Sequence, residues 1–343
     1  MTLKSSTAIV ANTAPLGFDT RLLARLDRLR LLSRRAPTGG QHAERRSRRR
    51  RGGSSLEFAD YREYSPGDDP RRIDWNSYGR LDRLFLKLYE EEEDLPVHLL
   101  IDASASMRWA PPLPSTSSPR PTKFDLARQL AAALAYVGLG RLDRVSLRFF
   151  GASNNSAQQS SALGLTRGKA QFHRALDFLA NPPLPAEAEG HSSSDVANGE
   201  TDDINAGLTA FSKRTRRAGL AIVLSDFFAP DSGHLEALTR LLHRRFEVQV
   251  LHVLDPAEID PAAEAQPLRG DLRLLDVERP RAFFDLTADE ALLRAYRREF
   301  DAFLAGLREF CARRGAGYAL LSTAVTLEEH LTRLLRSGQV LGR

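Results

Sequence analysis

Cysteine is almost absent from this chain, with Cys311 the only one among 343 residues. No disulfide can form within the chain, which indicates a reducing compartment, and we expect Cys311 to be a small buried residue of a helix. Long apolar runs are absent too, because no eighteen consecutive apolar residues occur and the early run at 7–11 is too short for the core of a signal peptide. We therefore expect a cytoplasmic protein with no membrane span.

Lysine is scarce, accounting for five of the 49 basic residues. The arginine excess extends along the whole chain, which indicates compositional bias rather than a nucleic-acid-binding face. Residues 1–51 hold 13 basic and three acidic residues, whereas the other 292 residues hold 36 and 41. The net positive charge therefore belongs to one arm. We interpret its arginine block at 45–51 as a solvated segment, with phosphate binding as the alternative.

Motifs for nucleotide hydrolysis and for histidine-based metal binding are also missing. No G-x-x-x-x-G-K-[ST] sequence occurs, so this sequence lacks the phosphate-binding loop typical of ATP hydrolysis. The eight histidines are scattered and form no pair at ligand spacing. These absences favour a binding protein over an enzyme.

The chain does contain enough apolar residues, 42%, for a substantial core. From residue 97 onward, apolar runs typical of buried strands alternate with segments of helical periodicity. We expect strands at 97–101, 145–150, 220–226, 248–254 and 318–322, and two short strands at 272–277 and 283–286 that lie at an edge or form a hairpin. We expect helices at 123–139, 171–179, 235–242, 289–314 and 327–335, and a further helix that ends near 214. This alternation predicts an α/β fold with a doubly wound, mainly parallel sheet and right-handed crossovers.

The predicted organisation has three parts. Residues 1–17 are expected to be a disordered N-terminus, 18–95 an N-terminal extension packed on the sheet, and 96–340 the main domain. Polar segments at 110–121 and 182–199 are expected to be loops.

The extension contains a segment at 56–75 that is dense in aromatic, acidic and arginine residues. We expect Tyr61, Tyr64, Ile73 and Trp75 to anchor this segment while its charged residues pair with one another. A self-contained ion-pair loop and a docking surface are both compatible with this composition.

Candidate site residues follow two of the predicted strands. Asp102, Ser104 and Ser106 form a D-x-S-x-S pattern after one apolar run, and Asp226 ends another. The carboxyl ends of parallel strands meet at one edge of a sheet, and open α/β sheets bind ligands there. We therefore expect these residues to share one site.

Thr201 is a fifth candidate on a separate loop, and its structural alternative is a helix N-cap. Hydroxyl and carboxylate oxygens favour hard cations over zinc. We expect a divalent cation, with Mg²⁺ first and Mn²⁺ or Ca²⁺ as alternatives.

The five residues resemble the metal-ion-dependent adhesion site of von Willebrand factor A domains, which share the predicted fold. The resemblance implies that Ser104, Ser106 and Thr201 bind the metal directly, whereas Asp102 and Asp226 act largely through bound water. Mostly neutral ligands leave the cation under-neutralised, so that its open position attracts a carboxylate from a partner. That is binding chemistry rather than turnover.

The resemblance extends beyond the site. Residues 64–75 read Tyr-x-x-Gly-Asp-Asp-x-Arg-x-Ile-Asp-Trp, which looks like the signature of the bacterial family called domain of unknown function 58, and the stretches 296–310 and 317–336 fit as well. Members of that family are similar to von Willebrand factor A domains and are typically encoded beside MoxR-type AAA+ ATPases. Glu200 departs from the family pattern, in which a glycine is common before the threonine.

We therefore expect a metal-dependent interaction module that works with a MoxR-type AAA+ ATPase and binds a client protein through an Asp or Glu. It would serve as an adaptor for chaperone-like maturation or assembly. One alternative is a metal-dependent hydrolase or phosphatase, in which Asp102 or Asp226 activates water. The other is a nucleic-acid binder that uses the arginine block.

Overall fold

The computed structural model describes residues 16, 18–33, 57–65, 68, 70, 73–90, 96–111, 121–151, 161–182, 204–228, 233–261, 270–277 and 283–342. The chain divides into two compact units, one made of Met1–Ser33 with Leu95–Arg343 and one made of Arg34–Asp94. Of the predicted N-terminal segment 1–17, only Leu16 is described. The arginine block at 45–51 and most of the two predicted polar loops also lie outside the described residues.

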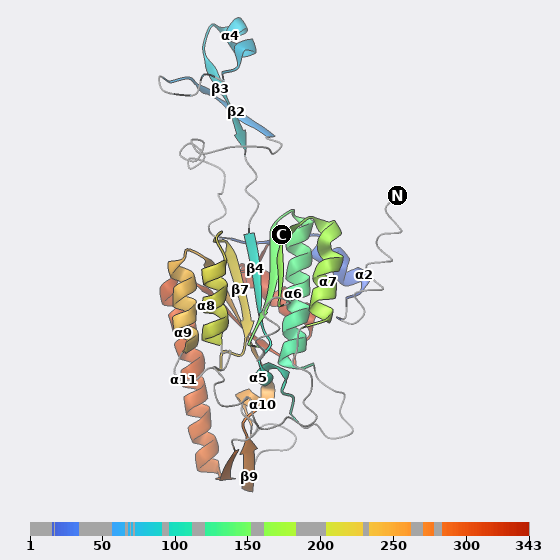
Figure 1. Ribbon diagram of the computed structural model, residues 1–343, viewed down its shortest axis with the longest axis vertical. Helices are drawn as coiled ribbons and strands as arrows, with labels where there is room; N and C mark the ends of the chain where they lie inside the picture. The colour runs from blue at the N-terminus through green and yellow to red at the C-terminus, as the bar shows by residue number, and fades with distance from the viewer. Residues whose placement is uncertain are drawn as a thin grey trace. The chain divides into compact units, whose positions relative to one another are not determined.

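The larger unit is built on a six-stranded sheet with the strand order β11–β8–β7–β4–β5–β6 (Figure 1). Neighbouring strands run parallel except β6, which is antiparallel to β5. The strands are β4 (Pro96–Asp102), β5 (Arg144–Phe150), β6 (Ala162–Arg167), β7 (Leu220–Ser225), β8 (Glu247–Leu254) and β11 (Gly317–Ser322). The predicted α/β class with a mainly parallel sheet is confirmed.

Helices cover both faces of this sheet. The helices α2 (Thr20–Leu26), α6 (Lys123–Gly140), α7 (Phe172–Ala180) and α12 (Leu327–Ser337) pack into one hydrophobic core. The helices α8 (Ile204–Arg214), α9 (Gly233–His243) and α11 (Glu290–Arg314) pack into a second core on the other face. Figure 1 shows α8, α9 and α11 on one side of β4 and β7, and α6 and α7 on the other.

The central strand β4 contributes to both cores, which explains why its sequence is apolar except for His98 and the terminal Asp102. Leu99 and Ile101 lie in the core with α6, whereas Leu100 lies in the core with α8 and α9. A strand buried on both faces has no need for polar alternation. Cys311 of α11 is fully buried, as predicted.

Helix α6 starts at a reciprocal cap. The Thr122 hydroxyl accepts a hydrogen bond from the Asp125 amide at 3.0 Å, and the Asp125 carboxylate accepts one from the Thr122 amide at 3.2 Å. Two amides that would otherwise lack partners are thereby satisfied. The first helical residue, Lys123, is held in a defined position as a result.

Replacing Thr122 with alanine should lower the free energy of unfolding by about 1 kcal/mol, because the hydroxyl that accepts from the Asp125 amide and donates to the Asp125 carboxylate is lost. Urea denaturation measures this loss. The control is Thr326→Ala at the start of α12, where the hydroxyl accepts one longer bond of 3.4 Å from the Glu329 amide. An equal loss in the two variants would contradict the role of the reciprocal cap.

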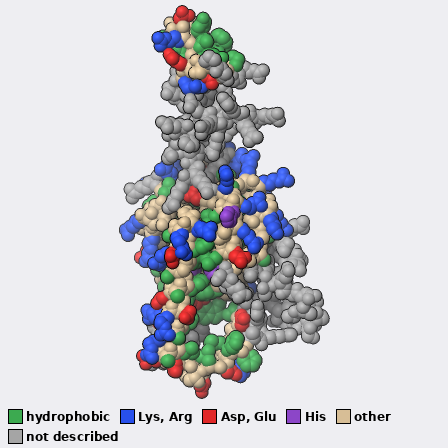
Figure 2. Space-filling model, turned by 90° about the vertical axis from the view of Figure 1, so that its left-hand side faces the viewer, with side chains coloured by type: hydrophobic (Ala, Val, Ile, Leu, Met, Phe, Trp, Pro, Cys, Tyr) green, Lys and Arg blue, Asp and Glu red, His purple; other side chains and the backbone are tan. Residues whose placement is uncertain are grey.

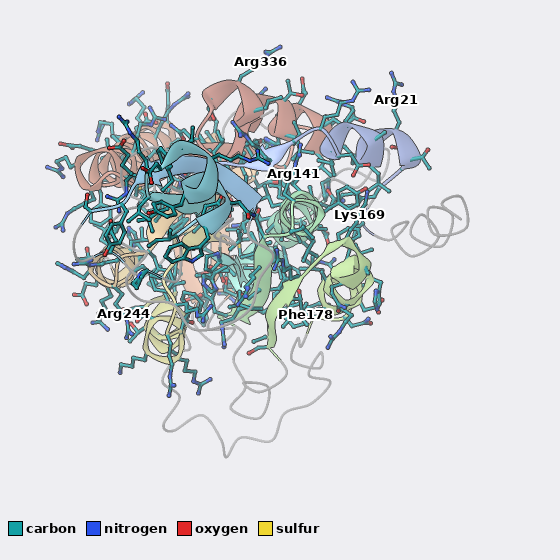
Figure 3. The ribbon with its side chains drawn as sticks, turned by 90° about the horizontal axis from the view of Figure 1, so that it is seen from above. Arg21, Arg141, Lys169, Phe178, Arg244 and Arg336 are labelled. Atoms are coloured by element: carbon teal, nitrogen blue, oxygen red, sulfur yellow. The ribbon has the colours of Figure 1, made fainter. Side chains whose placement is uncertain are left out.

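Basic side chains lie at the end of the sheet where its strands begin. Because the helices run back against the strands, their C-terminal ends lie at the edge where the strands begin, and basic side chains are favourable there. Figure 3 views the molecule from that end and labels Arg141 after α6, Arg244 after α9 and Arg336 in the last turn of α12. The predicted carboxylates lie at the opposite edge.

An antiparallel hairpin, β9 (Gly270–Leu275) with β10 (Phe283–Ala288), precedes α11. It is the short pair of strands predicted at 272–277 and 283–286. Several of its large apolar side chains are exposed, with Leu275 at 65% and Phe284 at 68%. Figure 2 shows hydrophobic side chains gathered at the lower end of the molecule, where Figure 1 places this hairpin.

The smaller unit consists of the antiparallel strands β2 (Glu57–Glu63) and β3 (Phe85–Glu90) and the helix α4 (Trp75–Leu81). Ile73 is buried, and Arg62 pairs with Asp68 at 2.9 Å, as predicted for anchoring and local pairing. Trp75 is 63% exposed, so its prediction as an anchor is wrong. Trp75 instead begins α4 after the Asp74 N-cap, which turns it out of the small core.

Candidate metal centre

Two buried carboxylates meet at the carboxyl edge of the sheet. Strands β4 and β7 are parallel neighbours, so they end at the same edge. Asp102 is the last residue of β4, and Asp226 directly follows β7. Both side chains are buried, and the charge of Asp226 helps to raise the pKa of Asp102. Two of the predicted site residues therefore lie within electrostatic reach of each other.

Asp102 is held by hydrogen bonds from both flanking segments. Its Oδ1 accepts from the Ser104 amide at 2.9 Å, and its Oδ2 accepts from the Ser225 hydroxyl at 2.5 Å. Burial, followed by the charge of Asp226, raises the pKa of Asp102 to about 7, whereas these hydrogen bonds act in the opposite direction. The carboxylate is thus fixed at the floor of the loop that carries the two serines.

Ser104 and Ser106 present their hydroxyls to each other. The two Oγ atoms are hydrogen-bonded to each other at 3.1 Å, and both residues are half-buried. Ser104 is the N-cap of the short helix α5 (Ala105–Arg108), yet its side chain makes no capping hydrogen bond. The loop therefore places two hydroxyl oxygens side by side next to Asp102.

Gly151 leaves room for this loop. Its φ is +77°, and a Cβ atom there would lie 2.7 Å from Oδ1 of Asp102 and 3.2 Å from the Ser104 amide nitrogen. Such a contact is far below ordinary van der Waals distance. The end of β5 thus comes so close to the site that only a glycine fits without moving the carboxylate.

Asp226 is not a free carboxylate, because the ammonium of Lys123 binds it. Lys123 Nζ donates to Oδ2 of Asp226 at 2.8 Å and also to Oε1 of Glu258, which lies in the short helix α10 (Pro256–Ile259). Lys123 is fully buried, with no exposed surface. Its burial lowers its pKa, but the two carboxylates outweigh that effect and hold the pKa above its usual value.

This lysine was missed in the sequence, where it appears only as the first residue of a predicted helix. One signal was available: Lys123 is one of only five lysines and stands beside Phe124 at the start of an apolar helix. A cation in that position needs a buried anion as its partner. The sequence contains no indication of which anion that is.

A histidine supports the backbone of Asp226. His252 Nε2 donates to the Asp226 carbonyl at 2.9 Å, and the Tyr318 hydroxyl lies 3.0 Å from Nδ1. Burial lowers the pKa of His252 to about 4, so the ring is neutral near pH 7. Phe227, the residue after Asp226, has a φ of +57°, an unusual conformation for a residue with a side chain.

The fifth predicted residue, Thr201, lies outside the described residues, as does its neighbour Glu200. Helix α8 begins at Ile204, close after it in the sequence. The role of Thr201 as a ligand therefore stays a prediction.

The described residues fit a small divalent cation. An octahedral Mg²⁺ has ligands at about 2.0–2.1 Å, so adjacent ligands lie about 2.9 Å apart. The Ser104 and Ser106 hydroxyls are 3.1 Å apart, close to that spacing. Among the described residues, no group of three or more His, Cys, Asp and Glu is arranged to hold a metal, but the predicted ligands are hydroxyls, which such a group does not include.

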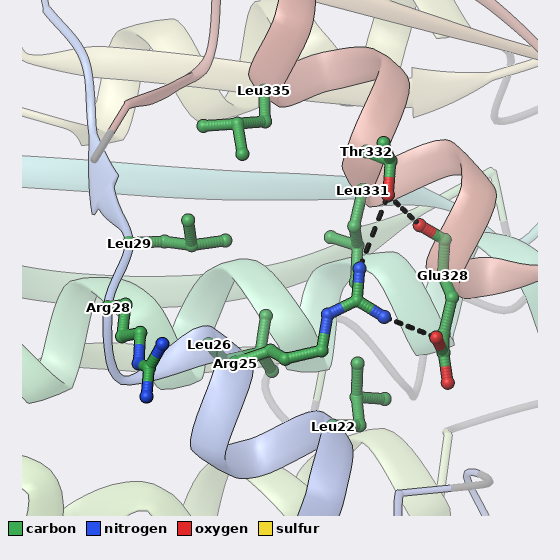
Figure 4. A pocket seen from close by; sticks show the side chains of 9 residues that line it. All are labelled: Leu22, Arg25, Leu26, Arg28, Leu29, Glu328, Leu331, Thr332 and Leu335. Atoms are coloured by element: carbon green, nitrogen blue, oxygen red, sulfur yellow. Dashed lines mark hydrogen bonds and ion pairs between the residues drawn. The ribbon is translucent and has the colours of Figure 1, made fainter.

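A separate hollow lies between α2 and α12. This pocket of about 510 Å³ is lined mainly by leucines, and Arg25 crosses it to Glu328 and Thr332 (Figure 4). It contains none of the predicted site residues.

The chain is thus an α/β protein with a mainly parallel sheet. Carboxylates and hydroxyls gather where the strands end, and they form a candidate ligand site. The chain belongs to the family described as Protein of unknown function DUF58, whose model matches residues 60–303. Uncharacterized protein Mb1516 of Mycobacterium bovis and Uncharacterized protein Rv1480 of Mycobacterium tuberculosis are each 29% identical to it over 273 residues. That stretch is 79% of this chain and 75% of each relative.

Two solved structures show a distant likeness. The conserved hypothetical protein BatB from Bacteroides thetaiotaomicron has 16% identity and a TM-score of 0.35, covering 70% of this chain and 96% of that one. An aerotolerance-related membrane protein from Bacteroides fragilis has 17% identity and a TM-score of 0.35, covering 71% and 97%. At this TM-score neither likeness supports a conclusion about this chain. In the part of the chain that the structure describes, no helix is both long and apolar enough to cross a bilayer.

Proposed function

We propose that this chain is a protein-interaction module that holds a divalent cation through Ser104, Ser106 and Thr201, with Mg²⁺ as the preferred ion. The bound cation in turn binds a carboxylate of a partner protein. The observation that carries this proposal is the 3.1 Å separation of the Ser104 and Ser106 hydroxyls beside buried Asp102. Asp102 and Asp226 do not bind the cation directly in this proposal but accept hydrogen bonds from water molecules bound to it. A bound cation supplies a positive centre with an open position.

The chain's own groups favour capture of a ligand over turnover. Both carboxylate oxygens of Asp102 accept hydrogen bonds from the protein, and Asp226 is engaged by an ammonium. Each of these carboxylate oxygens has one lone pair engaged by such a donor and one left to accept from water, which suits holding a metal-bound water more than removing its proton. We therefore propose that the site binds a partner and does not catalyse a reaction.

The proposed partner is a MoxR-type AAA+ ATPase, with a client protein that offers an Asp or Glu. Support comes from the family resemblance and from the absence of a phosphate-binding loop in this sequence. Exposed apolar side chains on the hairpin β9–β10 are typical of interaction surfaces. The proposal places the chain in the cytoplasm, because a single cysteine suits a reducing compartment.

The double substitution Ser104→Ala/Ser106→Ala should weaken Mg²⁺ binding by more than about 100-fold. Removing residues that only hydrogen-bond to metal ligands lowers metal affinity by about 10–100-fold, and this variant removes two direct ligands. Isothermal titration of MgCl₂ or MnCl₂ into EDTA-stripped protein measures this. The matched control is Ser322→Ala, at the carboxyl end of β11 in the same sheet, which should bind like the unsubstituted protein. Equal binding by all three proteins would contradict the proposed ligands.

The partner is tested by a pull-down with the ATPase encoded nearby, with Mg²⁺ and with EDTA. The unsubstituted chain should retain the ATPase only with Mg²⁺, and Asp102→Ala/Ser104→Ala should lose it in both conditions. Equal retention under all conditions would rule out the metal bridge.

A further inference from the structure

Lys123 is the most deeply buried charge near the candidate site. Its side chain has no exposed surface, and its ammonium lies between Asp226 and Glu258. Asp226 is itself 1% exposed. Burying an ammonium is costly unless carboxylates compensate for lost hydration, and here two do so. Neither the predicted metal ligands nor the fold requires a cation at this position.

Three elements hold the ammonium in place. The reciprocal cap of Thr122 and Asp125 fixes the start of α6, so Lys123 reaches the end of β7 from a rigid position. On the far side, Glu258 belongs to a second reciprocal cap, in which its Oε2 accepts from the Asp255 amide at 2.9 Å. The Phe228 ring lies 5.2 Å from Nζ. The ion pair is thus built into the frame of the site rather than formed by a mobile surface chain.

The ion pair between Lys123 and Asp226 reduces the negative charge around a bound cation. Asp226 and Asp102 interact electrostatically, and Asp226 is one of the two carboxylates expected to act on the cation through water. An ammonium 2.8 Å from Asp226 offsets its negative charge. Coulomb energy at this range is large inside a protein, so one internal positive charge alters the binding of every ion nearby.

We infer that Lys123 sets the charge of the metal centre: by pairing with Asp226 it weakens the hold on a divalent cation and leaves that cation more positive toward a partner carboxylate. This inference rests on the proposed function, because it concerns the same site. Lys123 acts through Asp226 and is not proposed to contact either the cation or the partner carboxylate, so it is a positioning residue. Its substitution should therefore change the two affinities in opposite directions.

Lys123→Met should tighten Mg²⁺ binding by about tenfold and weaken carboxylate binding by a similar factor. The carboxylate probe is sodium acetate titrated into Mn²⁺-loaded protein, with displacement of water from Mn²⁺ followed by water-proton relaxation and sodium chloride as the salt control. Glu258→Gln leaves the ammonium with one fewer carboxylate. It should therefore weaken Mg²⁺ binding and strengthen acetate binding, each by a few-fold (about 2–5-fold).

General damage to the fold would weaken both ligands in both variants, which separates it from the expected pattern. Thermal melting with and without Mg²⁺ supplies a second readout, since tighter binding gives a larger Mg²⁺-dependent rise in Tm for Lys123→Met. Should that variant fail to fold, Lys123→Gln keeps a hydrogen-bond donor without the charge and carries the same expected signs.

If the unsubstituted protein binds no divalent cation, the proposed function fails and this inference fails with it. If it binds Mg²⁺ but the lysine variants bind Mg²⁺ no more tightly, or bind acetate no more weakly, the inference is overturned while the proposed function stands.

Discussion

Asp226→Asn is expected to lower the free energy of unfolding by about 3 kcal/mol, because it leaves the buried ammonium of Lys123 with a neutral neighbour. Lys123 has no exposed surface, and its bond to Asp226 is 2.8 Å long. Glu258 still compensates part of the charge, which keeps the loss near the lower end of the range for breaking a buried ion pair. Urea denaturation at constant pH measures the change.

The matched control for this substitution is Glu236→Gln. Glu236 pairs with Arg240 one turn along α9 at 3.4 Å, and both side chains are about half exposed or more. An exposed pair of this kind contributes about 0.5 kcal/mol or less. Similar losses in the two variants would show that the buried pair is as weak as a surface one, which would contradict the role of Asp226 as the counterion of Lys123.

Gly151→Ala is expected to weaken Mg²⁺ binding by more than about tenfold and to lower the free energy of unfolding by about 2–4 kcal/mol. A Cβ atom at this position would lie 2.7 Å from Oδ1 of Asp102, and the φ of +77° is unfavourable for alanine. The carboxylate or the loop with Ser104 has to move. Either movement changes the arrangement beside the two hydroxyls.

Gly315→Ala separates backbone strain from this contact. Gly315 ends α11 with a φ of +70°, and a Cβ atom there would meet nothing within 4 Å. This variant should lose about 1 kcal/mol of stability through the left-handed backbone and keep its affinity for Mg²⁺. If Gly151→Ala also keeps that affinity, the close approach of β5 does not matter to the proposed site.

The order and type of elements could be predicted from the sequence because their signals are local. A run over 97–101 that is apolar except for His98 predicts a strand buried on both faces, and β4 is that strand. Helical periodicity over 123–139 predicts a helix, and α6 spans Lys123–Gly140. Each pattern depends on residues close together in the chain, where side-chain periodicity alone determines which face is buried.

Part of the candidate site was predictable for a related reason. Asp102 ends one apolar strand and Asp226 directly follows another, and parallel strands of one sheet end at one edge. Their proximity therefore follows from the fold class. The prediction failed for Trp75, which is 63% exposed because α4 begins there, and the composition of its segment contains no information on which way that helix turns.

The sequence by itself determined the α/β class, the strands that end in aspartate and the two serines between which a cation is proposed to bind. Only the tertiary structure decided that Lys123 neutralises Asp226, since these residues are 103 positions apart and meet solely through the packing of α6 against the sheet. It also decided that Gly151 must lack a side chain, because another strand delivers that residue to Asp102. Local patterns specify which segments form strands and helices, whereas charges and close contacts between distant segments depend on where the whole chain brings them together.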